Sequence, residues 1–185
     1  GLVRKYNASV APAKSAAVVH LHVGEILEDY HKDVSVDALL QGPEFCEWKE
    51  IARTDLLRKG GVGKTKQKDE DEELMRHCYV LNASYYKRQI KKLQHRGPNV
   101  KDVVLVAVSP NDASGMGFRR SSAYIRGVRR LFKAAGYRVH LRLGQKPDDD
   151  FALMSRATYF VQGGGGFSIL IAGVVAELGG TVLRD

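Results

Sequence analysis

The sequence has little cysteine and no long hydrophobic run, and each shortage excludes a class of protein. Its 185 residues include two cysteines, Cys46 and Cys78, too few for a disulfide framework or a four-cysteine zinc site. No apolar run approaches the roughly 20 residues that cross a bilayer, so we predict no membrane-spanning segment. Since 44% of the residues are hydrophobic, the chain can bury one core, and we expect a single domain over residues 1–185.

Acidic residues are outnumbered, and the excess of positive charge favours anionic partners. The chain has 29 Lys and Arg against 21 Asp and Glu, a formal net charge of +8. This balance favours phosphates, nucleotides, nucleic acid or a membrane surface as partners, without choosing among them. The chain begins at Gly1 rather than Met and has no signal-peptide segment, as expected of a processed or excised piece of a longer protein.

Apolar runs alternate with amphipathic segments from Lys101 onward, with short connections between them. This pattern predicts an α/β fold, a Rossmann-like parallel sheet with helices on both faces. Ligands of such sheets bind beyond the carboxyl ends of the strands, which directs attention to the loops there. Strands are predicted at 15–23, 78–81, 102–109, 137–143, 158–162 and from about 181, and helices at 36–40, 84–95, 120–135, 147–156 and 167–178.

Residues 59–73 hold almost no apolar side chain and are predicted to form a flexible charged loop. Within them, residues 59–65 (Lys-Gly-Gly-Val-Gly-Lys-Thr) match the letters of a variant phosphate loop. A working phosphate loop follows an apolar strand and opens a buried helix. The flanking residues fit neither role, so a phosphate-loop ATPase using 59–65 is the weaker alternative.

Two histidines flank Leu21 at the end of the first predicted strand. Because alternate residues of a strand point the same way, His20 and His22 are expected on one side, as metal ligands or as a hydrogen-bonding pair. The other histidines are scattered along the sequence. Satisfied strand histidines are therefore favoured, and we predict no metal site.

Four glycines, residues 163–166, separate a predicted strand from an apolar helix and are followed by Phe167 and Ser168. Glycines let backbone approach a ligand, and the helix start offers free N–H groups, so this turn is a candidate anion cradle. A plain flexible turn is the alternative. Arg119 and Arg120 lie near the loop that follows the strand predicted at 102–109, and they are candidates to clamp a diphosphate. Most arginines of the helix predicted at 120–135 are expected to form a solvated face.

Three blocks together resemble the donor-binding half of the fucosyltransferase superfamily, which includes the α-1,2, α-1,6 and protein O-fucosyltransferases. Residues 20–25 (His-Leu-His-Val-Gly-Glu) look like the family's His-x-Arg-x-Gly-Asp motif. Residues 150–157 are similar to its Asp-hydrophobic-Met-Ser block, and residues 159–168 resemble the strand and Ser-Ser-Phe-Ser type turn that follow. The likeness runs from Val18 to Arg184, with no recognisable signature over 26–100.

The resemblance implies a metal-independent, inverting glycosyltransferase that uses a GDP-sugar, usually GDP-fucose, and needs no cofactor. It implies a GT-B-type fold whose carboxyl-terminal lobe holds the nucleotide, and an acceptor hydroxyl that the sequence does not identify. Asp150 would contact the base or ribose, and Gly165 to Ser168 the diphosphate. The substrate-binding residues implied are His20, His22, Gly24, Arg119, Arg120, Asp150, Ser155, Gly165, Gly166, Phe167 and Ser168.

The main departure from the family motif is His22, which takes the place of its arginine. His22 would stabilise the departing diphosphate, and Glu25 would be an optional base. The loss of a permanent charge leaves a second hypothesis open, a catalytically silent member acting as a binding or assembly module in a larger complex such as a ribonucleoprotein. The sequons at 7–9 and 82–84 fit a Golgi-lumen enzyme, with the cytoplasm as the alternative.

Overall fold

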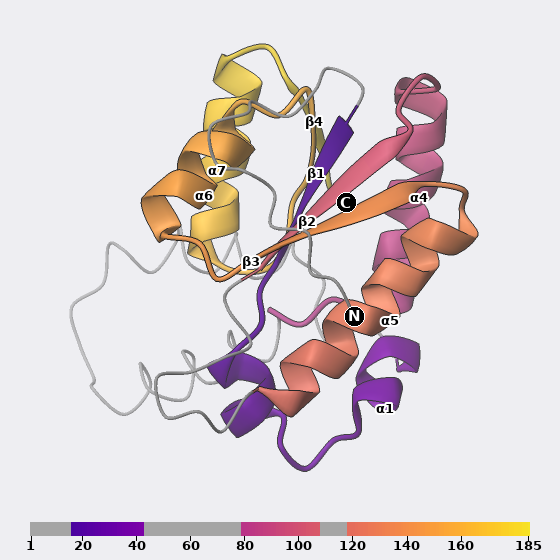
Figure 1. The fold of residues 1–185 in the computed structure, drawn as a ribbon, viewed down its shortest axis with the longest axis vertical. Coiled ribbons are helices and arrows are strands. Elements are labelled where there is room, and N and C mark those ends of the chain that lie inside the picture. Colours follow the sequence, from indigo (N-terminus) through magenta and orange to yellow (C-terminus); the bar gives the residue numbers. More distant parts are fainter. Residues whose placement is uncertain (1–15, 43–78, 108–117) are drawn as a thin grey trace, which may run out of the picture.

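The computed structural model describes residues 16–42, 79–107 and 118–185, which form one parallel sheet with helices on both faces (Figure 1). The predicted α/β, Rossmann-like class is confirmed. The sheet has five strands in the order β3-β2-β1-β4-β5, and every pairing between them is parallel. The strands are β1 (Ala16–Leu21), β2 (Asp102–Ala107), β3 (Arg138–Leu143), β4 (Tyr159–Val161) and β5 (Thr181–Leu183).

Each face of the sheet packs against its own set of helices (Figure 1). Val19, Leu21 and their in-register neighbours pack under the helices α1 (Val36–Gln41), α4 (Ala83–Arg96) and α5 (Arg119–Ala134). Val18 and its neighbours pack under α6 (Pro147–Ser155) and α7 (Gly166–Glu177). Covered on both sides, the central strands are almost wholly apolar, as parallel sheets require. Within the described ranges, every helix is too short or too polar to cross a membrane.

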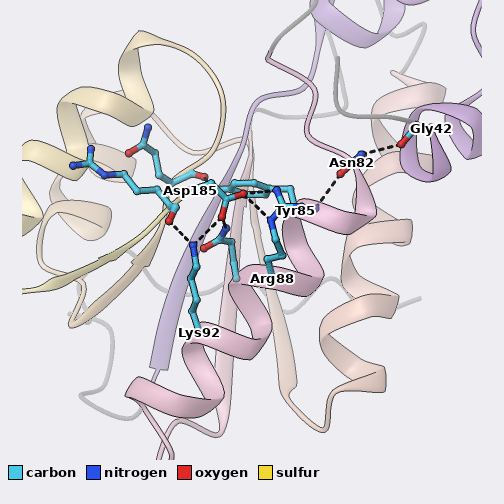
Figure 2. Close-up of polar contacts among 9 residues, drawn as sticks. Gly42, Asn82, Tyr85, Arg88, Lys92 and Asp185 are labelled. Atoms are coloured by element: carbon cyan, nitrogen blue, oxygen red, sulfur yellow. Dashed lines mark hydrogen bonds and ion pairs between the residues drawn. The ribbon is translucent and has the colours of Figure 1, made fainter. Parts of the chain in front are cut away.

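The start of α4 is fixed by Asn82 (Figure 2). Its side-chain oxygen accepts the Tyr85 N–H at 2.9 Å, and its amide nitrogen donates to the Gly42 carbonyl at 2.8 Å. This cap satisfies a helical N–H group that has no intrahelical partner. Because Asn82 is buried and both ends of its amide are engaged, the sequon at 82–84 is structural rather than open to glycosylation. The sequon at 7–9 lies outside the described residues.

The strand predicted at 78–81 is wrong. Residues 79–81 form a bend that leads into the Asn82 cap, and Cys78 lies outside the described residues. Val80 and Leu81 are apolar because they pack in the core beneath the helices, and the Leu81 carbonyl accepts the Tyr124 hydroxyl. Both sides of β1 are occupied, by β2 and by β4, so residues 79–81 cannot pair with it. Their strand-like pattern reflects burial alone.

The remaining predicted elements agree with the structure to within one or two residues at the ends that it describes, and one element was missed. A π-helix, η1 (Ile26–Tyr30), begins after residues 22–25, and the sequence pattern did not predict it. The predicted charged loop at 59–73, with the candidate phosphate loop at 59–65, lies outside the described residues.

The carboxylate of Asp185 joins the end of β5 to α4 (Figure 2). Its two oxygens accept hydrogen bonds from Arg88 Nε at 2.9 Å, Gln89 Nε2 at 2.8 Å and Lys92 Nζ at 2.8 Å. Burial raises the pKa of Asp185, but these donors outweigh it and bring the pKa to about 2. Gln89 is fully buried, so Asp185 is the acceptor that its amide needs.

Replacing Asp185 with alanine is expected to lower the free energy of unfolding by about 1 kcal/mol at pH 7, because the buried Gln89 amide loses its acceptor. The pKa lies below its ordinary value, so the stabilisation is present above pH 4 and is lost as the pH falls through about 2. Urea denaturation of both proteins across this window measures the difference. Asp33→Ala at an exposed position is the control, and an equal loss in both variants would contradict the assignment.

Candidate ligand site at the carboxyl ends of β1 and β4

The strand order reverses between β1 and β4. From β1 the chain builds outward through β2 to β3, then returns to place β4 on the other side of β1. In open parallel sheets, ligands bind beyond the carboxyl ends of the strands at such a switch point. The segments that follow β1 and β4 there are residues 22–25 and 162–166, which belong to two of the three blocks singled out in the sequence.

Close packing requires three of the four glycines after β4. A Cβ atom on Gly163 would lie 2.3 Å from the His20 carbonyl oxygen, and one on Gly164 would lie 2.3 Å from the Tyr79 carbonyl oxygen. Gly165 has a φ of +84°, and a Cβ atom there would lie 2.6 Å from His22 Nδ1. The sequence had suggested that the glycines leave room for a ligand. At these three positions they instead let the turn pack against the end of β1.

The fourth glycine is different, because a Cβ atom on Gly166 would meet nothing within 4 Å. Gly166 is the first residue of α7 and is exposed. The turn below it is held by Ser168, whose hydroxyl accepts the Gly163 N–H at 2.7 Å. Ser168 is fully buried, so its hydroxyl stabilises the turn rather than facing solvent.

Aromatic rings surround this turn. The His20 ring lies 5.7 Å from the Phe167 ring and 6.4 Å from the His22 ring, and His22 lies 4.9 Å from Tyr79. Phe167 is 38% exposed, and its ring lies 6.2 Å from that of Phe151 on α6. The structure therefore places the rings of His20, His22 and Phe167 close together.

Both histidines are uncharged at neutral pH. Burial, with a smaller contribution from His22, lowers the pKa of His20 to about 4. Burial also lowers the pKa of His22, although a hydrogen bond with the Gly164 backbone and the charge of Glu25 partly oppose the shift. His22 therefore does not supply the permanent cation that the family's arginine would. Glu25 is exposed beside it.

Arg120 does not face the site. Its Nε donates to the Leu27 carbonyl at 2.7 Å, and its Nη2 donates to the carbonyls of His31, at 2.6 Å, and Val34. Because the guanidinium holds the segment that ends η1, the expectation that Arg120 clamps a diphosphate is corrected. Arg119, the first residue of α5, is exposed.

Two further residues predicted to bind the substrate, Gly24 and Ser155, have a structural role or lie away from the glycine turn. The N–H of Gly24 donates to the Ser121 hydroxyl at 3.0 Å, so this glycine serves the turn into η1. Its φ of +88° explains the residue type. Ser155 is the last residue of α6, which runs back from the carboxyl end of β3 toward the start of β4. It therefore lies toward the amino ends of the strands, away from Gly166.

Asp150 is buried at the start of α6 and forms an ion pair that the sequence analysis missed. Arg142 Nε donates to Asp150 Oδ1 at 2.6 Å. Burial raises the pKa of the Asp150 carboxyl, and Arg142 opposes that rise. The local sequence carried no clear signal, because Arg142 continues the alternation of Arg138 and His140 with apolar residues in β3.

A shallow pocket lies at the opposite edge of the sheet. It is formed by residues just before β2 and β3, among them Gly97, Lys101 and Tyr137, at the amino ends of those strands. It is remote from the blocks described above. Among the described residues, no three His, Cys, Asp or Glu side chains are grouped so as to hold a metal ion.

Comparison with known proteins finds a likeness to solved structures. No family model matches the chain, and no curated protein matches it. Solved structures that resemble it include POFUT1 in complex with GDP, at 14% identity and a TM-score of 0.41, over 92% of this chain and 42% of that one. POFUT1 in complex with GDP-fucose gives 15% identity and a TM-score of 0.41, over 93% and 40%. The chain thus spans about two fifths of the length of these proteins.

Proposed function

We propose that this chain binds a nucleoside diphosphate sugar of the GDP-fucose class and transfers the sugar to an acceptor hydroxyl. One observation carries the proposal: an open helix start, Gly166, follows a tightly packed glycine turn at the switch point of the sheet. The sequence resemblance to fucosyltransferases favours a GDP-sugar among such donors.

The start of α7 suits a diphosphate. The first N–H groups of a helix have no intrahelical partner, and the dipole of a 12-residue helix favours negative charge there. Gly166 leaves space for a phosphate oxygen to approach these N–H groups. Such preorganised donors stabilise the charge that develops on a departing diphosphate.

The transfer itself needs little more than positioning. The acceptor oxygen bonds to the anomeric carbon as the bond from that carbon to the diphosphate breaks, and GDP leaves. The exposed carboxylate of Glu25 is our candidate to take the hydroxyl proton. Neutral His22 would act as a hydrogen-bonding group toward the donor rather than as a cation.

Two helical glycines provide a matched test. Gly166 and Gly173 both lie in α7 with nothing within 4 Å of an added Cβ atom, but only Gly166 is at the helix start. We expect Gly166→Ala to weaken GDP binding about 10-fold or more by filling the space for phosphate, and Gly173→Ala to leave it unchanged. Calorimetric titration of GDP, GDP-fucose, UDP and ATP without metal measures this. Equal affinities in the two variants would contradict the proposal.

The second candidate function is a binding or assembly module without catalysis. It is favoured by the charge of α4 and α5, because neither helix contains an acidic residue. Two neighbouring helices that both carry positive charge repel each other and favour a polyanionic partner. If none of the four nucleotides bound, this function would replace the first. The exposed basic residues are Lys87, Lys91, Arg96, Arg126, Arg130 and Lys133.

A further inference from the structure

One buried guanidinium at the carboxyl edge of the sheet is only partly used. The Arg142 side chain is fully buried, and its Nε donates to Asp150. Nη1 and Nη2 are also buried, and neither has a hydrogen-bond partner in the part of the chain that the structure describes. A guanidinium has five N–H donors, and buried donors are nearly always paired. The Arg142–Asp150 pair therefore lacks an acceptor at its far side.

The register of the sheet places Arg142 on the same side as His20. Arg142 pairs with Val106, and Val106 pairs with His20. In-register residues of parallel strands point to the same face, which here is the face under α6 and α7. Arg142 thus shares a face and a level with the histidine beside the glycine turn.

Its distance from the glycine turn suits the other end of a nucleotide. β3 and β4 are separated by β2 and β1, so three strand spacings of about 4.8 Å put them about 14 Å apart. A nucleotide bound with its diphosphate at Gly166 and its base toward β3 would meet Arg142 and Asp150. Phe167 adjoins Gly166, Phe151 adjoins Asp150, and the two rings lie 6.2 Å apart, so contacting side chains connect the two ends.

We infer that Arg142 is a specificity-determining residue that, with Asp150, reads the base of the bound nucleotide. This inference rests on the proposed function. The carboxylate offers only acceptors and the terminal nitrogens only donors, so together they fit a base edge that carries both. Guanine presents N1–H and a 2-amino group to a carboxylate, and O6 to a guanidinium.

Other bases fit this pair less well. Adenine places an amino group where guanine has O6, so two donors would meet at Arg142. Uracil carries carbonyl oxygens on both sides of N3–H, so one oxygen would face the Asp150 carboxylate. The pair therefore predicts selection of a 6-oxopurine, with Arg142 responsible for position six.

IDP and ADP both lack the 2-amino group and differ at position six, which would face Arg142, and at N1, which would face Asp150. We expect calorimetry of the purified chain to give IDP an affinity about 10-fold or more above that of ADP. In Arg142→Met the ratio should fall, because position six loses its donor while N1 still meets Asp150, and inorganic pyrophosphate should bind as before. Gly173→Ala, which leaves the ion pair intact, should keep the ratio.

The outcomes separate this inference from the proposed function. The role of Arg142 would be overturned if the IDP to ADP ratio were unchanged in folded Arg142→Met, or if the variant lost as much affinity for pyrophosphate as for IDP. Either result would leave the proposed binding of a nucleotide sugar standing. Failure of the unaltered protein to bind any nucleotide would overturn both. If Arg142→Met does not fold, the ratio in the unaltered protein decides, since equal affinities for IDP and ADP would overturn base reading.

Discussion

Gly163→Ala is expected to destabilise the protein by about 2 to 3 kcal/mol, the cost of forcing extra volume into a packed interior. The added Cβ atom would lie 2.3 Å from the His20 carbonyl oxygen and 3.0 Å from its carbon. Neither atom can move easily, because β1 is held by ladders to β2 and to β4. The shift needed would also strain the hydrogen bond from Gly163 to the Ser168 hydroxyl.

The matched control is three residues away, at the other end of the turn. Gly166→Ala meets no atom within 4 Å and is expected to leave the free energy of unfolding unchanged or raise it by up to about 1 kcal/mol. Urea denaturation followed by circular dichroism compares the two. A Gly163→Ala midpoint equal to that of Gly166→Ala would mean that the turn is not packed against β1 as described.

The second large effect is a loss of stability in mild acid. The pKa of His20 is about 4 in the folded protein and 6.5 when unperturbed, so the unfolded chain binds the proton more tightly. Stability is therefore full above pH 7 and declines as the pH falls from 6.5 toward 4. A change of this size corresponds to roughly 3 kcal/mol from His20, and the lowered pKa of His22 acts in the same direction.

His20→Leu tests the assignment by removing the titrating group while keeping a buried side chain beside Phe167. The free energy of unfolding, measured by urea denaturation between pH 7 and pH 4, should fall much less steeply in the variant. Titration of Asp185 does not interfere, since its window lies below pH 4. Parallel curves for the two proteins over this range would exclude His20 as the source.

The sequence predicted those parts of the fold that local pattern determines. The apolar run of β2, and the helical spacing of Ile125, Val128 and Phe132 in α5, placed these elements to within one or two residues at the ends described. Residues 79–81 show where this fails, because an apolar run reports burial and not strand pairing. Which apolar segment joins a sheet depends on neighbours that are distant in sequence.

The candidate site was also predictable from the sequence only where local motifs determine it. The turn at 163–166 and the histidines at positions 20 and 22, at the end of β1, were found from local motifs, and the structure places them side by side. The hydrogen bonds from Arg120 to three backbone carbonyls could not be predicted, because these carbonyls follow β1 whereas Arg120 lies in α5. The ion pair of Arg142 with Asp150 needed the β3–α6 turn to be known.

The central place of β1 determines when this chain can fold. Ala16 pairs with Asp102 and Ala17 with Tyr159, so the middle of the sheet is made from residues far apart in the sequence. Such non-local pairings slow folding, because long loops must close before the contacts form. During synthesis β1 emerges before the other strands that the structure describes, and it waits unpaired for β2 and then β4. We therefore expect the sheet to assemble only after β4 has been synthesised, with β1 needing protection from aggregation until then.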